Sequence, residues 1–218
     1  YDICGVRLDR SGRVLDFGPL RVSDAANHQF RPSIAFDGTN YLAAWCDWRI
    51  GDDSDIYSTR ISQGGMALDP AGLQVSISAY PQYSPSVAFD GANYLIVWED
   101  GRKWPDPFKI YGARVDQSGV VLDPQGIEIS VTASWQRDPS VAFDGTNYLA
   151  VWEDSHNGTD LDIYGARVSQ SGLVIDVAGI PISAAEDSQE HASVAFDGTN
   201  YFVVWRDRRP RWESPVYG

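Results

Sequence analysis

The stretch Pro139-Ser-Val-Ala-Phe-Asp-Gly-Thr-Asn-Tyr-Leu-Ala-Val-Trp-Glu-Asp154 decides how this chain folds, because it occurs four times with small changes. The phenylalanine before each Asp-Gly pair marks the copies, and its spacings are 53, 54 and 53 residues, at Phe36, Phe89, Phe143 and Phe196. Self-similarity at a period of this size is typical of repeat architectures. Residues that recur in every copy are explained by folding, so function is expected where the copies differ.

Each copy predicts four short strands and no helix, because no segment keeps a helical period. In the third copy the strands are expected at 140–143, 147–152, 163–168 and 173–183. The Asp-Gly-Thr-Asn segment between the first two predicts a tight hairpin, since glycine accepts positive φ and Asp or Asn bonds its own backbone. The first strand is almost continuously apolar, which fits burial on both faces.

Four-stranded units of about 50 residues predict an all-β fold, a four-bladed β-propeller with antiparallel strands in each blade. A sandwich or a stack of small β domains is the alternative, but a unit of 53 residues would be marginal when folded alone. The expected blades cover about 31–76, 84–130, 138–183, and 192–207 joined to 1–23. This split last blade would close the ring and leave no open sheet edge. If the array were longer, two chains would complement one another instead.

Composition excludes some classes of partner. The net charge of −13 argues against nucleic acid, whose phosphates require clustered Lys and Arg. No run approaches the ~20 apolar residues of a membrane helix, and no signal peptide is visible. The chain opens at Tyr1, so a processed form is expected. Cys4 and Cys46 do not make a disulfide framework, and a bridge between them is the less favoured alternative.

The repeat, followed in each unit by a segment such as Asp-Ile-Tyr-Gly-Ala-Arg-Val168, resembles the tandem repeats of large secreted or cell-surface bacterial proteins. This resemblance spans nearly the whole chain and implies a secreted or surface location, without a uniform activity. In blade number the chain is also similar to hemopexin-like domains, which bind proteins or an ion at a central channel. That similarity implies a possible calcium or other cation in the channel and no other cofactor.

The sequence contains no HExxH, CxxC, GxSxG or P-loop pattern. The histidines at positions 28, 156 and 191 are expected to be solvated in loops, although His28 and His191 can approach each other. An aspartate ends the second strand of every copy, at Asp47, Asp100, Asp154 and Asp207. These could form a ring of acids, or a glycosidase pair at ~5 to 9.5 Å. Their fourfold recurrence favours a structural role, as turn caps or partners of Arg7, Arg60, Arg114 and Arg167.

Two further sets are candidates for ligand binding at the mouth of the channel. One glutamine precedes each first strand, at Gln29, Gln82, Gln136 and Gln189, and could bind a polar ligand or bridge the backbones of adjacent blades. Four tryptophans break the repeat and fall in loops expected on one face, namely Trp48, Trp104, Trp135 and Trp212. Loop tryptophans suit stacking on sugar rings or anchoring a protein partner. Alternatively, they fold over the blade ends as lids.

These observations favour a non-catalytic, secreted binding or adhesion propeller that recognises a glycan or a protein, as a monomer or a domain-complemented oligomer. A purely structural repeat domain of a larger surface protein is the second hypothesis. A glycoside hydrolase or lyase with carboxylates at the channel mouth is the third.

Overall fold

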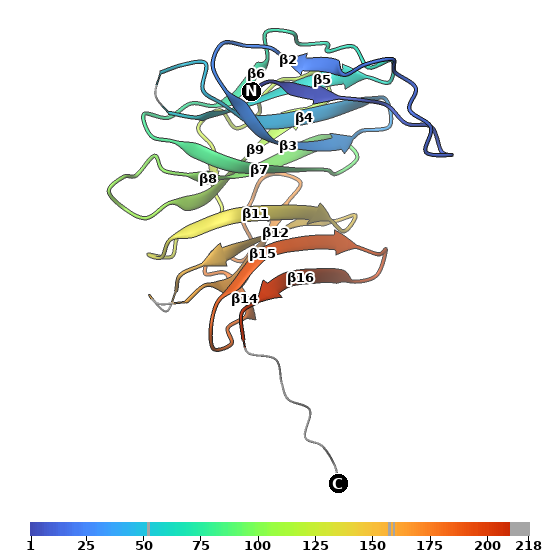
Figure 1. Ribbon diagram of the computed structural model, residues 1–218. Helices are drawn as coiled ribbons and strands as arrows, with labels where there is room; N and C mark the ends of the chain where they lie inside the picture. The colour runs from blue at the N-terminus through green and yellow to red at the C-terminus, as the bar shows by residue number, and fades with distance from the viewer. Residues whose placement is uncertain (52, 157, 159, 210–218) are drawn as a thin grey trace.

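The structure, a computed structural model, describes residues 1–51, 53–156, 158 and 160–209. Within these ranges the chain forms β-strands and no helix, arranged as antiparallel sheets that follow one another in chain order (Figure 1). No helix in this part of the chain is long and apolar enough to cross a membrane. The expected all-β class is therefore confirmed.

Three units are complete four-stranded sheets. The first contains β3 (Gln29–Phe36), β4 (Asn40–Asp47), β5 (Asp55–Ser62) and β6 (Leu73–Ser76). The second contains β7 (Gln82–Phe89), β8 (Asn93–Asp100), β9 (Lys109–Asp116) and β10 (Ile127–Glu128). The third contains β11 (Gln136–Phe143), β12 (Asn147–Asp154), β13 (Asp162–Ser169) and β14 (Ile180–Ser183). Each sheet is a meander in which consecutive strands pair.

The ends of the described chain form two half units. β1 (Ile3–Gly5) pairs with β2 (Leu20–Ser23), and β15 (Gln189–Phe196) pairs with β16 (Tyr201–Asp207). These two-stranded sheets lie at opposite ends of the array (Figure 1). The expected sheet that joins 192–207 to 1–23 is therefore not formed within the described residues, because each half unit packs on its own neighbouring sheet. Closure into four blades stays a prediction.

The hydrophobic core lies between consecutive sheets rather than inside each one. One face of the second strands β4, β8 and β12 packs against the next unit, as Leu95 and Val97 pack against Val141 and Ala150. The recurring tryptophans Trp45, Trp98 and Trp152 are fully buried. The first strands β3, β7 and β11 are only partly buried, which corrects the expectation of burial on both faces. The second strands β4, β8 and β12 are more buried, because a neighbouring unit packs on each of their two faces.

The hairpin turns follow the predicted chemistry. Asp144 Oδ1 accepts hydrogen bonds from the amides of Thr146 and Asn147, both at 2.7 Å. Gly145 between them has a φ of 94°, a conformation that a side chain disfavours. The other three copies of this turn carry the same pair of bonds.

Each repeated arginine of a third strand binds an aspartate that the sequence analysis did not identify as its partner. Arg60 binds Asp69 with its backbone amide at 2.9 Å and its guanidinium at 2.7 and 2.9 Å. Equivalent ion pairs recur as Arg7–Asp16, Arg114–Asp123 and Arg167–Asp176. The residues around the Arg167–Asp176 pair form a turn, so β14 begins at Ile180 and not at 173 as expected. In the first half unit β1 and β2 are also short, and an isolated bridge joins Leu8 and Val14.

Candidate active site

One residue in each first strand departs from the strand backbone. Positive φ values of 55°, 54°, 47° and 56° occur at Arg31, Ser84, Asp138 and His191. The strand pairing shifts register at each of these positions, which marks a bulge that re-aims its side chain. The four residues line one depression of about 310 Å³ together with the residues that follow them, Pro32, Pro85, Pro139 and Ala192. This depression is called the mouth below.

Asp138 accepts hydrogen bonds from two other residues of the mouth. Its Oδ1 accepts a hydrogen bond from Ser84 Oγ at 2.7 Å and from Arg31 Nη1 at 3.1 Å. Arg31 also donates to Ser84 Oγ. Because these residues come from β3, β7 and β11, the contacts tie three first strands together. The two hydrogen bonds fix the orientation of the Asp138 carboxyl group.

Glu153 lies beside Asp138 and is completely buried. Its Oε2 accepts a hydrogen bond from Arg137 Nε at 2.7 Å, and its Oε1 accepts one from the His191 amide at 2.6 Å. The His191 Nδ1 atom lies 3.6 Å from Glu153 and 3.9 Å from Asp138. A buried carboxylate requires such partners, because an unpaired charge in this position would be strongly destabilising.

Glu99 is the third carboxyl group near the mouth and has a different environment. Burial first, and then the negative charge of Asp138, raise its pKa from an ordinary 4.5 to about 7. Weaker opposing contributions come from Arg31, Arg137 and a hydrogen bond from the Asp138 amide. A carboxylic acid that keeps its proton near neutral pH beside an ionised carboxylate is the arrangement that acid–base catalysis requires.

The same cluster offers metal ligands. One ligand atom each from Asp138, Glu153 and His191 lies within 4.8 Å of the other two. However, both Glu153 oxygens already accept hydrogen bonds. A cation would therefore compete with Arg137 for this group.

The predicted glutamines lie in the walls of the units. All four are buried to within 1% exposure. Gln82 Nε2 donates to Ser76 Oγ at 2.9 Å and to Asp100 Oδ2 at 2.8 Å, while its Oε1 accepts from the Ile56 amide of the preceding unit at 3.3 Å. Gln136 has the equivalent partners, and Gln29 and Gln189 bind loop carbonyls. Their amides are engaged in bonds between loops and units.

The irregular tryptophans that the structure describes do not form a single group. Trp104 and Trp135 are 49% and 46% exposed, and their rings meet edge to face at 6.1 Å. Trp135 also stacks on Phe108, with ring centroids 5.3 Å apart. Trp48 is half-buried and lies 6.3 Å from the ring of Phe30. Trp212 lies outside the described residues. The structure thus joins two of the four into one exposed aromatic pair.

The recurring aspartates are structural. Asp47 accepts a hydrogen bond from Trp45 Nε1 at 2.8 Å and pairs with Arg49 at 2.6 Å. Asp100 accepts a hydrogen bond from Trp98 and pairs with Arg102, and Asp207 does the same with Trp205 and Arg209. Asp154 accepts a hydrogen bond from Trp152 Nε1 at 3.2 Å. Because these carboxylates accept hydrogen bonds from the core tryptophans, they are not catalytic acids of the mouth.

Sequence reasoning missed the mouth residues, although a signal was present. The residue before each recurring aspartate varies between the copies: it is cysteine, glutamate, glutamate and arginine, at Cys46, Glu99, Glu153 and Arg206. The bulge position differs in all four copies. His191, expected in a solvated loop, lies in β15 at the mouth, whereas His28 contacts the Tyr1 amino group at 3.1 Å and His156 packs on Tyr164. Cys4 and Cys46 are both free, and burial raises the pKa of Cys46 to about 12.

Comparisons with known proteins place this architecture among propeller-type domains. No family model and no curated protein matches the sequence. A thermostable family-43 glycoside hydrolase is similar in structure at a TM-score of 0.58 and 15% identity, over 83% of this chain and 66% of that one. The α-L-arabinanase of Penicillium chrysogenum complexed with arabinobiose has a TM-score of 0.62 at 14% identity, over 86% and 63%. An α-L-arabinofuranosidase from Lactobacillus brevis has a TM-score of 0.54 at 11% identity, over 81% and 63%.

The chain thus spans 63–66% of the length of these solved structures. At such low identity the likeness establishes the propeller-type fold. It also overturns our leading hypothesis of a non-catalytic binding or adhesion propeller, since these neighbours are named as enzymes: a family-43 glycoside hydrolase, an α-L-arabinofuranosidase and an α-L-arabinanase.

Proposed function

We propose that this chain is a glycoside hydrolase domain whose reaction takes place at the mouth. The observation that carries the proposal is the pairing of Glu99, whose pKa is raised to about 7, with Asp138, which is held by Arg31 and Ser84. Glycosidic bond cleavage uses two carboxyl groups in different protonation states. The mouth supplies such a pair from two adjacent units. The names of the structural neighbours support the same reaction class.

Each carboxyl group has a separate role in this proposal. Glu99 donates its proton to the leaving-group oxygen, because burial keeps it protonated up to about pH 7. Asp138 acts as the carboxylate that stabilises or attacks the sugar carbon, or activates water. Arg31 orients Asp138 through the bond at 3.1 Å. Glu153 holds His191 and Arg137 in place from its buried position.

Trp104 and Trp135 are proposed to bind the sugar chain. The two exposed rings adjoin one another, and Trp135 precedes β11, the strand that carries Asp138. Aromatic faces suit the C–H surfaces of sugar rings. Substitution of either residue by alanine should raise KM and leave kcat nearly unchanged. The secreted or cell-surface location stays a prediction that agrees with a polysaccharide substrate.

The test is a panel of aryl glycosides and polysaccharides, beginning with arabinan and xylan, assayed with purified protein. Asp138→Asn should lower kcat at least 100-fold on every substrate that the native protein cleaves. Glu99→Gln should do so on polysaccharide but much less on a 2,4-dinitrophenyl glycoside, whose leaving group needs no proton. Asp106→Asn, an exposed carboxylate in the loop after β8, is the matched control. A native protein inactive on the whole panel, or an unimpaired Asp138→Asn variant, contradicts the proposal.

A further inference from the structure

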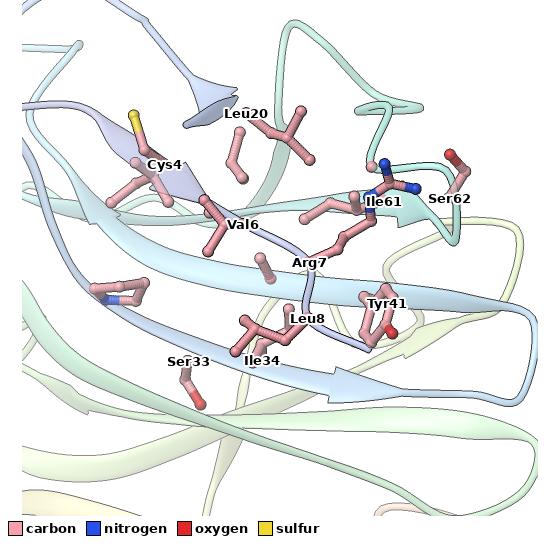
Figure 2. A pocket seen from close by; sticks show the side chains of 16 residues that line it. Cys4, Val6, Arg7, Leu8, Leu20, Ser33, Ile34, Tyr41, Ile61 and Ser62 are labelled. Atoms are coloured by element: carbon pink, nitrogen blue, oxygen red, sulfur yellow. The ribbon is translucent and has the colours of Figure 1, made fainter. Parts of the chain in front are cut away.

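An apolar groove of about 370 Å³ lies between β1 and the first full sheet. Figure 2 shows Val6 and Leu8 from the N-terminal segment beside Ile34 of β3 and Tyr41 of β4. Val6, Leu8 and Ile34 are 47%, 57% and 59% exposed. The first half unit covers only the outer part of this sheet, where Ile3 packs with Trp45 and Tyr57. The inner part is left open.

The internal units show what normally occupies this position. The residues equivalent to Ile34 are Val87, Val141 and Val194, and they are only 8%, 7% and 9% exposed. Each is covered by the second strand of the preceding unit, as Val141 is covered by Leu95 and Val97. The groove therefore has the shape and chemistry that in the other units receives a first and a second strand.

The other end of the array presents the matching surface. Phe202 and Val204 of β16 are 72% and 49% exposed. The equivalent residues Leu95 and Val97 are completely buried against the next unit. β16 thus carries the face that would cover Ile34, with nothing packed on it within the described residues.

Polar contacts between units repeat with the same offset. The serine of one first strand accepts from an amide of the next, as in Ser86–Val141 at 3.2 Å, Ser33–Val87 at 3.2 Å and Ser140–Val194 at 3.3 Å. The tyrosine of each second strand donates to a carbonyl of the preceding unit, in Tyr94–Asn40, Tyr148–Asn93 and Tyr201–Asn147. The next members of both series are Ser193 with the Ile34 amide, and Tyr41 with the Asn200 carbonyl. Their halves lie at opposite ends of the array.

The strand edges also correspond. Second and third strands pair in all three full units, with Val97 opposite Gly112 and Val151 opposite Gly165. The same register would place Val204 opposite Gly5 and Tyr201 opposite Leu8. Within the described chain β1 pairs with β2 and β16 with β15. An unpaired strand edge is a template for another strand.

We propose that the groove receives β15 and β16 of a second copy of this chain, so that copies join head to tail through a completed four-stranded unit. A second copy fits because the two half units lie at opposite ends of one molecule (Figure 1), and both surfaces can join as they stand. The contact reproduces the three internal interfaces. A head-to-tail contact of this kind generates a ring where its rotation closes. The proposal rests on packing between units and is independent of the catalytic proposal.

Site-specific cross-linking tests the pairing directly. Gly5→Cys and Val204→Cys are made as separate proteins in a Cys4→Ser background, because Cys4 is exposed and Cys46 is buried. A Cβ at Gly5 meets only Val22, at 3.9 Å. Mixing the two variants with a short bismaleimide should give a covalent dimer, whereas replacing Val204→Cys by Leu173→Cys should not. No cross-link in the mixture, or a cross-link formed only within single chains carrying both substitutions, overturns the proposal.

Solution mass gives the second test. The native protein should show the mass of two or more chains by light scattering at tens of micromolar, and Phe202→Glu should weaken that association at least 100-fold. Phe202 is exposed within one chain, so this variant should fold. Leu173→Glu is the matched control, because Leu173 is 67% exposed and its equivalents Met66 and Val120 are exposed in internal units too. A monomeric native protein, or equal association by the two variants, overturns the proposal.

Discussion

Two sequence positions per unit build the mouth, and their members differ in charge. The bulge position carries arginine, serine, aspartate and histidine, while the position that accepts the next bulge amide includes Glu99 and Glu153. The backbone at each bulge is nearly the same, with φ from 47° to 56°. A repeated backbone thus presents an asymmetric set of side chains. Asymmetry of this kind is needed when one carboxyl group must hold a proton and another must not.

Glu99 should make stability depend on pH. Because its folded pKa is raised to about 7 above an ordinary 4.5, its stabilising contribution is complete below about pH 4.5 and is lost as pH rises through 7. Relative to the native protein, Glu99→Gln should therefore gain roughly 2 kcal/mol in unfolding free energy between pH 5 and pH 8. Urea denaturation at both values measures this change. Glu186→Gln, at an exposed position, should show no such gain, and an equal response of both variants would contradict the buried environment of Glu99.

The recurring and irregular tryptophans should differ in their contribution to stability. Trp152 is completely buried and donates to Asp154 at 3.2 Å, so Trp152→Ala should lower the unfolding free energy by about 3–5 kcal/mol. Trp104 is 49% exposed, so Trp104→Ala should cost under about 1 kcal/mol. Chemical denaturation of the two variants gives both values. Similar losses would show that our division into core and surface tryptophans is wrong.

At the scale of elements, the strand pair β1–β2 protects the first full sheet. Ile3 is 5% exposed and packs, together with Val22, in a cluster with Ala43, Trp45 and Tyr57. Deleting residues 1–23 uncovers this cluster and should lower the melting temperature or cause aggregation. If the deletion fails to fold, Ile3→Ala keeps the test available and should cost about 2–4 kcal/mol. Val14→Ala, at a residue 53% exposed, is its control. Full stability of both Ile3→Ala and the deletion would exclude this protective role.

At the scale of the whole molecule, head-to-tail assembly should couple stability to concentration. Partners that bind only the folded state stabilise it by mass action. A tenfold rise in protein concentration is then worth up to ~1.4 kcal/mol, or roughly 3–5 °C in melting temperature. Scanning calorimetry over two decades of concentration should show this trend for the native protein and not for Phe202→Glu. A melting temperature that is constant for the native protein contradicts the assembly.

The sequence by itself determined what is local and repeated. Turn chemistry at Asp144-Gly145 and the alternating apolar runs predicted the strands and hairpins, because these depend on neighbours within a few residues. The recurrence of Trp152 and its equivalents predicted the core, and the period predicted a propeller-type fold. The aspartates after these tryptophans were correctly taken as structural. Their arginine partners were not identified, since Arg60 binds Asp69 across a turn instead.

Only the tertiary structure decided which non-repeated residues meet. Arg31 and Asp138 are 107 positions apart and bind each other, because stacked sheets bring equivalent bulges of different units to one depression. The pKa of Glu99 likewise depends on burial and on Asp138 from the next unit. The open groove beside β1 could be found only in the structure, since the sequence of 1–23 predicts the same strands whether or not another sheet packs beside them. Contacts between distant segments depend on how sheets stack, and no local pattern records that.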